Sequence, residues 1–251
     1  MSIRIVSHCY AAQLPHYAEF LKYQLSSLAL NPVPCPVAIT VCYCPADEAT
    51  WDVLRWFGEN EGIGLDPLPL PLPALGRRSI GRNTAALEST EDLIWFCDVD
   101  HVFGPGCLSA LWETWRRLRL PEYDRALFRD SDSPPMMIFP RHIKIHKDHA
   151  TGDAAALRAR GKFLVEIDPA EFIDKTYSRA IGGIQIADGE HVRKYGYLAG
   201  TKWQEPRTDG RPFADFKDDL AFRGQVSAHG RIGGIELPSL YRLRHPTTTY
   251  Q

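Results

Sequence analysis

The sequence lacks the marks of several large protein classes. Charge of one sign is not in excess, since 29 lysines and arginines stand against 31 aspartates and glutamates, so a basic face for nucleic-acid phosphates is not expected. No apolar run approaches the roughly 18 residues that cross a bilayer, and residues 1–8 reach polar side chains too early for a signal peptide. We therefore expect no nucleic-acid partner, no transmembrane segment and no leader.

Glycine-rich phosphate loops and paired cysteines are also missing. No G-x-x-x-x-G-K-[ST] loop is present and no G-x-G-x-x-G follows an expected strand, which argues against P-loop ATPases and dinucleotide dehydrogenases. The six cysteines form no C-x-x-C pair and are too sparse for a disulfide framework, so we expect reduced thiols and a cytoplasmic location. Cys42 and Cys44 would share one face of a strand, but no second pair completes a metal site.

Strand and helix patterns alternate along the first half of the chain. Residues 93–97 form a continuous apolar run of strand length, which is typical of a strand buried on both faces. Strands are expected at 3–6, 37–43 and 93–97, and helices at 17–30, 46–61, 79–89 and 108–118. This alternation predicts an α/β fold with a mostly parallel central sheet flanked by helices, and 251 residues are enough for one domain.

The other segments are expected to be less regular. Prolines alternate with leucines over 67–73, which predicts a stiff surface connector of polyproline type. Between about 121 and 179 we expect strands at 126–128 and 136–139, a short helix at 154–160 and an exposed connection over 144–148. The last part is expected to hold a helix over 189–195, an acidic and apolar segment over 213–223 and a final strand over 239–243.

The D-x-D string Asp98-Val99-Asp100 is the most informative motif. It follows the buried strand directly, at the edge where α/β sheets place their ligands. Alternation along an extended chain points both carboxylates to one side. Together they can hold a hard divalent cation whose remaining positions are filled by water and phosphate oxygens.

Around this motif the sequence resembles the metal-dependent glycosyltransferases with the GT-A fold, of the family-2 and galactosyltransferase C-terminal types. The resemblance rests on the order of short segments, which are 3–10, 78–83, 98–101, 182–183, 217–223 and 242–246. It implies transfer of a sugar from a nucleoside-diphosphate sugar, most simply UDP-linked, to a carbohydrate or other hydroxyl acceptor. Residues of about 1–120 would bind the nucleotide sugar, and those of about 121–251 would supply the acceptor side and the catalytic group.

The resemblance also implies roles for single residues. Asp98, Asp100 and His245 would bind Mn²⁺ or Mg²⁺ and thereby stabilise the departing diphosphate. The residues expected to contact the donor are Ser7, Tyr10, Tyr43, Asp47, Arg78, Arg82, Asn83, Asp98, Val99, Gly183 and Trp203. For several of them a structural role is the alternative: Asp47 as a helix cap, Trp203 as a core residue, and the two arginines as solvated helix residues.

The catalytic base is expected among three aspartates. The family places a Glu-Asp pair seven and six residues before the arginine that is Arg223 here, but those positions are Phe216 and Lys217. We therefore expect Asp218 first, followed by Asp219 and Asp215, to accept the acceptor proton in a reaction with inversion. The alternative is that Asp218 and Asp219 only favour a helix start.

Three other functions are compatible with parts of the sequence. A polar cluster of His142, His146, His149 and Asp148 suggests a zinc hydrolase, although no H-E-x-x-H string is present. A binding protein without activity is compatible with the displaced Glu-Asp pair. A metal-dependent nucleotidyltransferase would also use paired carboxylates and phosphate-binding arginines.

Overall fold

A computed structural model of the chain describes residues 2–120, 135–147, 157–160, 163–206 and 217–245. Its centre is a seven-stranded sheet in the order β12-β6-β11-β4-β1-β2-β3. The strands in chain order are β1 (Ile3–His8), β2 (Val37–Tyr43), β3 (Gly64–Pro69), β4 (Leu93–Phe96), β6 (Met137–Pro140), β11 (Gln185–Asp188) and β12 (Ile232–Ile235). β4, β1, β2 and β3 are parallel neighbours, as are β12 and β6, whereas β11 is antiparallel to β4 and β6. The predicted α/β class with a mostly parallel sheet is confirmed.

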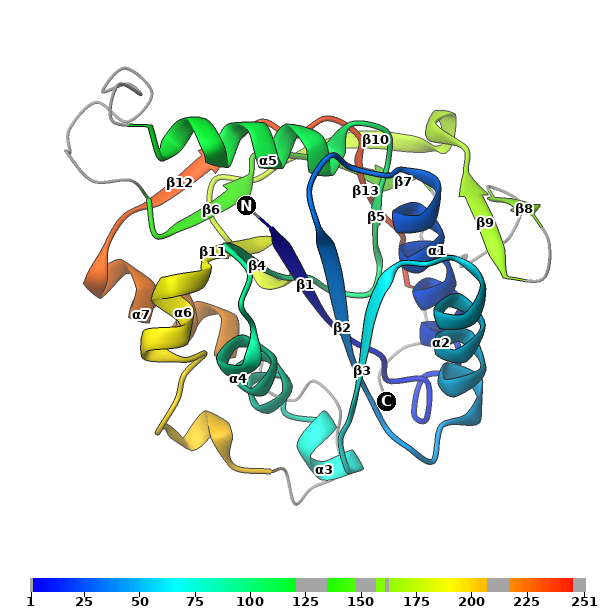
Figure 1. Cartoon of the computed structure of the whole chain (residues 1–251), viewed down its shortest axis with the longest axis horizontal. Helices are drawn as coiled ribbons and strands as arrows, with labels where there is room; N and C mark the ends of the chain where they lie inside the picture. The colour runs from blue at the N-terminus through cyan, green and yellow to red at the C-terminus, as the bar shows by residue number, and fades with distance from the viewer. Residues whose placement is uncertain (1, 121–134, 148–156, 161–162, 207–216, 246–251) are drawn as a thin grey trace.

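Helices cover both faces of this sheet. α4 (Arg78–Glu88), α6 (Gly189–Tyr195) and α7 (Asp218–His229) gather on one side, and α1 (His16–Leu30), α2 (Glu48–Asn60) and α5 (Cys107–Leu118) on the other (Figure 1). Short helical turns are α3 (Leu72–Leu75), η2 (Pro169–Glu171), η3 (Gly182–Ile184) and η4 (Lys202–Gln204). The starts and ends of α2, α4 and α5 differ from the predicted ones by at most two residues.

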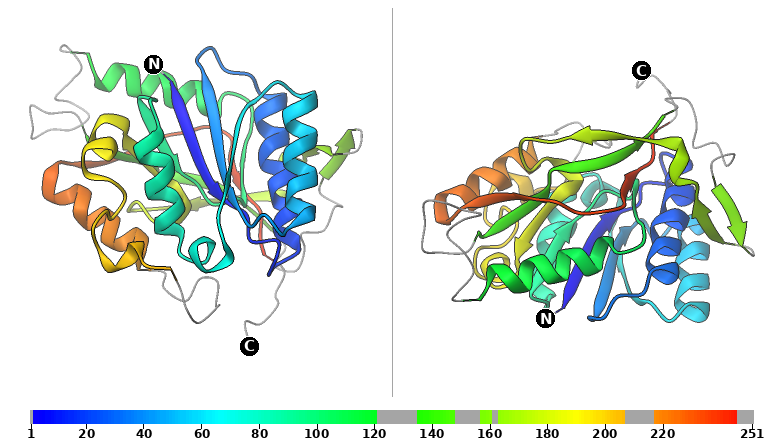
Figure 2. Two further views of the ribbon diagram at one scale, coloured as in Figure 1. Left: turned by 60° about the horizontal axis from the view of Figure 1, so that its bottom comes forward. Right: turned by 90° about the horizontal axis from the view of Figure 1, so that it is seen from above.

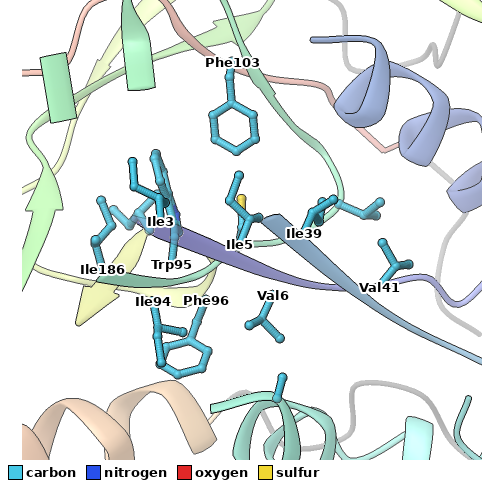
Figure 3. Packing of buried hydrophobic residues seen from close by; sticks show 14 of the residues in the cluster. Ile3, Ile5, Val6, Ile39, Val41, Ile94, Trp95, Phe96, Phe103 and Ile186 are labelled. Carbon is cyan, nitrogen blue, oxygen red and sulfur yellow. The ribbon is translucent and has the colours of Figure 1, made fainter. Parts of the chain in front are cut away.

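The core lies between the central strands and these helices. Side chains alternate along each strand, so that Ile5 and Trp95 point to one face while Val6 and Phe96 point to the other (Figure 3). All four are completely buried. Trp95 reaches Phe103 at a ring distance of 5.1 Å. The apolar run of 93–97 is thus a strand covered on both faces, as predicted.

A second, four-stranded sheet is built from segments of the middle and of the C-terminal part of the chain. It has the order β10-β7-β13-β5, and Figure 2 shows it beside the central sheet. Its strands are β5 (His101–Phe103), β7 (His142–His146), β10 (Phe172–Thr176) and β13 (Leu240–Arg242), and β8 (Leu157–Arg160) and β9 (Leu164–Ile167) form a separate ribbon. β13 runs antiparallel to β5 with Arg242 opposite His101. This register brings the segment before His245 next to the residues that follow Asp98.

The proline-rich segment differs from the predicted surface connector. Instead of a connector, residues 64–69 form the edge strand β3, in which Pro67 pairs with Val41 and Pro69 with Tyr43. The next residue donates from Leu70 N to Tyr43 O at 2.8 Å, so by alternation the proline nitrogens point away from β2. Proline is tolerated at this position because an edge strand needs no N–H on its outer side.

Two further segments also differ from expectation. Residues 157–160, expected to be helical, pair with β9 as an antiparallel strand, and 142–146 form β7 between β10 and β13 rather than an exposed connection. β8 pairs with the nearby β9, and β7 with the more distant β10 and β13, and local periodicity shows neither pairing. The expected strand at 126–128 lies outside the described residues.

None of the described helices is long and apolar enough to cross a membrane. All six cysteines are described, and all are free thiols in buried positions.

Candidate functional site

A pocket of about 350 Å³ opens at the edge of the sheet where β1 and β4 end. Because the two strands are parallel neighbours, their carboxyl ends meet at this edge, which is where open α/β sheets bind ligands. The residues that line it are His8, Tyr10, Tyr17, Arg78, Asp98, Val99, Asp100, His101, Tyr177, Ile181, Gly182, Gly183, Ile184, Asp219, Arg242 and His245. The D-x-D string is therefore at the centre of the pocket.

Asp98 is held by two arginines from α4. Arg78 Nη1 and Arg82 Nη2 each donate to Asp98 Oδ1 at 3.2 Å. The Arg82 side chain is completely buried and also donates to Tyr197 Oη at 2.9 Å, whereas the Asp98 side chain is 28% exposed to the pocket. Burial alone would raise the pKa of the Asp98 carboxyl, but Arg78 and Arg82 outweigh it and hold this pKa below its usual value.

Asp100 is more deeply buried and has partners from the second sheet. Arg242 Nε donates to Asp100 Oδ2 at 2.9 Å, and His101 Nδ1 lies 2.9 Å from Oδ1. His245 Nε2 lies 3.2 Å from the same Oδ2. Burial raises the pKa of the Asp100 carboxyl, and the opposing effects of Arg242 and His101 bring it well below the usual range. The pairing of β13 with β5 thus places Arg242 and His101 beside Asp100.

The start of α7 contributes two aspartates with different surroundings. Asp218 is buried and accepts from Arg78 Nη2 at 2.7 Å, so Arg78 bridges Asp98 and Asp218. Asp219 lines the pocket, and its Oδ2 accepts from the Gly182 backbone N–H at 2.6 Å. Asp215 lies outside the described residues. Of the two described candidates, Asp219 is the one whose carboxylate reaches the pocket wall.

Glycines allow close approach at two points of the site. A Cβ on Gly183 would lie 2.5 Å from the Asp98 backbone nitrogen, so η3 approaches the D-x-D string only without a side chain there. A Cβ on Gly81 would lie 2.5 Å from His8 Nε2 and 2.6 Å from Cys42 Sγ. The glycine at 81 lets α4 lie against the end of β1, which places Arg78 and Arg82 over Asp98.

The structure brings only some of the predicted donor contacts to the pocket. Tyr10, Arg78, Asp98, Val99 and Gly183 line it, and Arg82 contacts Asp98 from behind. The other five predicted contacts are absent from its lining, namely Ser7, Tyr43, Asp47, Asn83 and Trp203.

These five residues have structural partners instead. Ser7 Oγ donates to Cys97 O at 3.3 Å, and Asn83 Oδ1 accepts from Tyr197 N at 2.9 Å. Asp47 Oδ1 accepts from Thr50 N at 3.2 Å as the N-cap of α2, in line with its alternative role. The ring of Tyr43 stacks on Trp51 at 6.1 Å, and the Trp203 ring lies between the cationic groups of Arg77 and Lys202.

Several residues of the site were not predicted from the sequence. These residues are His16 and Tyr17 on α1, Tyr177 directly after β10 and Arg242 at the end of β13, and they reach the pocket or its partners. Arg242 stands three residues before His245, so its position is the one signal in the sequence that could have shown its role. The other three depend on tertiary packing.

The alternative zinc site does not assemble in the described part of the chain. His142 and His146 lie four residues apart on β7, which separates their backbones by about 13 Å. The His142 side chain is 48% exposed while His146 is buried. His149 and Asp148 lie outside the described residues.

The charges of the pocket fit a divalent cation that shares its ligands with a substrate. With the histidines counted as neutral, three guanidinium groups (Arg78, Arg82, Arg242) and four carboxylates (Asp98, Asp100, Asp218, Asp219) give a formal charge of −1. A diphosphate would be repelled from such a pocket without an added cation. Among the described residues no group of three His, Cys, Asp or Glu side chains is already arranged to hold a metal ion, and this includes Asp98, Asp100 and His245. An ion bound here would need phosphate oxygens and water as further ligands.

Comparison with known proteins gives similarity in structure but not in sequence. No family model matches the chain, and no curated protein matches it. The structure of S. aureus TarS 1-349 is similar with a TM-score of 0.58 at 12% identity, over 97% of this chain and 60% of that one. The same protein in complex with UDP gives 0.58 at 11% identity, with the same shares of the two chains covered.

A mannosyltransferase of Pyrobaculum calidifontis, PcManGT in complex with GDP-Man and Mn²⁺, is similar with a TM-score of 0.56 at 13% identity, over 99% of this chain and 58% of that one. This chain therefore spans about three fifths of the length of these solved chains. At such low identity the likeness shows the fold. The chain has a GT-A-like fold.

Proposed function

We propose that this protein is a metal-dependent glycosyltransferase that moves a sugar from a nucleoside-diphosphate sugar, UDP-linked, to a hydroxyl acceptor. The observation that carries the proposal is the pocket at the ends of β1 and β4, where Asp98, Asp100, Asp219 and His245 converge. Its formal negative charge supports an added cation. Structural neighbours in complex with UDP, and with GDP-Man and Mn²⁺, support a nucleotide-sugar donor.

The donor diphosphate would lie beside the D-x-D carboxylates and Arg242. Asp98, Asp100 and His245 would hold Mn²⁺ or Mg²⁺, which when bound neutralises the diphosphate and stabilises it as a leaving group. Arg242 is bound to Asp100 through its Nε. The two terminal nitrogens of its guanidinium are well suited to accompany a diphosphate, because guanidinium groups donate two parallel hydrogen bonds to phosphate.

Asp219 is the carboxylate that we propose as the base. The acceptor hydroxyl oxygen forms a bond to the anomeric carbon while the bond from that carbon to the diphosphate oxygen breaks and its electron pair leaves with the diphosphate. The hydroxyl proton goes to the Asp219 carboxylate, and attack opposite the leaving group inverts the configuration. The sequence favours Asp218 for this role, but its burial against Arg78 supports a positioning function for Asp218 instead.

The proposal is tested by identifying the products formed from UDP and GDP sugars with Mn²⁺, with Mg²⁺ and with a chelator. Metal-dependent release of nucleoside diphosphate supports glycosyl transfer. Release of pyrophosphate would instead identify a nucleotidyltransferase, and binding without release would identify a protein that only binds the nucleotide sugar. Binding itself is visible by thermal unfolding, since a ligand at a hundredfold excess over its Kd stabilises by about 2.7 kcal/mol, or about 5–10 °C for a chain of this size.

A further inference from the structure

His245 is held on both sides of its imidazole ring. Its Nε2 lies 3.2 Å from Asp100 Oδ2, and its Nδ1 lies 3.2 Å from His16 Nε2. The rings of Tyr17 and Phe20 pack against it at 5.3 and 5.0 Å between ring centres. His16 begins α1, so the first turn of that helix surrounds a side chain that arrives from the far end of the chain.

The two neighbours of the ring determine where its proton lies. A carboxylate only accepts hydrogen bonds, so Nε2 of His245 carries a proton when it faces Asp100. In the neutral ring Nδ1 is then an acceptor, and His16 Nε2 donates to it. A cation bound at Nε2 needs the lone pair of that nitrogen, so the proton must then lie on Nδ1, and His16 Nε2 must accept.

A histidine at position 16 can hydrogen-bond to His245 Nδ1 both when His245 Nε2 faces Asp100 and when it binds a cation. Its own proton can lie on Nδ1 or on Nε2, so that Nε2 of His16 either donates or accepts. A lysine or arginine at this position could only donate, and an apolar side chain could do neither.

We propose that His16 is a positioning residue that lets His245 turn from Asp100 to a divalent cation by changing between donor and acceptor at Nδ1. The inference rests on the metal role proposed above for His245. Partners that hold the second nitrogen of a metal-binding histidine typically contribute 10- to 100-fold to metal affinity, so a loss of about that size is expected when His16 is replaced by an apolar residue.

The test measures the affinity for Mn²⁺ in the presence of UDP by titration calorimetry, without any turnover. The variants are His16→Leu, which removes the hydrogen bond, and His16→Gln, whose amide can donate or accept. His142→Leu is the matched control, because His142 is a half-exposed histidine on β7 outside the pocket. Thermal unfolding of the metal-free proteins checks that each variant is folded.

We expect His16→Leu to weaken Mn²⁺ binding about 10- to 100-fold, His16→Gln to recover most of that loss, and His142→Leu to bind like the wild type. In a His245→Ala background, His16→Leu should cause no further loss, because its effect passes through His245. Long-range ¹H–¹⁵N NMR should place the His245 proton on Nε2 in the metal-free protein and on Nδ1 with Mg²⁺ and UDP.

Two outcomes would contradict the role of His16 and the metal role of His245 separately. If His245→Ala loses Mn²⁺ affinity but His16→Leu does not, or if His16→Leu weakens binding further in the His245→Ala background, the role of His16 is wrong while the metal site stands. If the wild type binds no Mn²⁺ with UDP, the metal role of His245 is wrong and the inference about His16 is wrong with it.

Discussion

Replacement of Arg82 by methionine should destabilise the fold strongly although the residue lies beside a pocket. The Arg82 side chain is completely buried, ion-paired to Asp98 Oδ1 at 3.2 Å and hydrogen-bonded to Tyr197 Oη at 2.9 Å. Its guanidinium also lies 5.8 Å from the Phe96 ring centre. Removal of one partner of a buried ion pair costs about 3–5 kcal/mol. Because Arg78 still donates to Asp98 Oδ1 and Asp98 is partly exposed, we expect the lower end, about 3 kcal/mol, which corresponds to a decrease in Tm of roughly 6–12 °C.

The measurement is urea unfolding of Arg82→Met followed by circular dichroism. Arg55→Met is the matched control, since Arg55 and its partner Asp52 are 57% and 54% exposed, and a change of at most about 0.5 kcal/mol is expected there. The double variant Arg82→Met, Asp98→Asn should recover part of the loss, because the carboxylate that has lost one of its two arginines is then uncharged. Equal stability of Arg82→Met and Arg55→Met would refute the idea that Arg82 compensates the buried charge of Asp98.

Three further predictions concern the carboxylates and the glycine of the site. Asp219→Asn should retain donor binding but lower the rate of transfer by about 10²- to 10⁴-fold, measured as release of nucleoside diphosphate, whereas retention of full activity would show that Asp219 is not the base. The pKa of the Asp100 carboxyl is lowered in the folded state, so the ionised group stabilises the fold fully above the pKa that it has in the unfolded chain, and this contribution is lost as the pH falls below about 5. Asp100→Asn should therefore flatten the decrease in Tm between roughly pH 5 and pH 3, and an unchanged profile would contradict this. Gly183→Ala should destabilise by about 1–3 kcal/mol or more in urea unfolding, because its Cβ would meet the backbone nitrogen of Asp98 at 2.5 Å, and a neutral result would mean that η3 moves freely away from β4.

Features that depend on one short segment were predictable, and those that depend on pairing were not. The buried strand over 93–97, the cap of α2 at Asp47 and the helix over 108–118 each follow from local periodicity or local hydrogen bonding. The edge strand β3 and the strand β7 do not, because only a neighbouring strand stabilises them. A proline-rich segment forms a strand when its nitrogens point away from the sheet, and the sequence does not show which side that is.

The candidate site divides in the same way. The sequence by itself determined that Asp98 and Asp100 follow a buried strand of an α/β sheet, since an apolar run of that length must be covered on both faces and its polar end must lie at an edge. Only the tertiary structure decided the partners of these carboxylates, because Arg78, Asp219 and Arg242 come from α4, α7 and β13. The pairing of β13 with β5 and the close approach at Gly183 bring them together, and neither leaves a periodic signal in the chain.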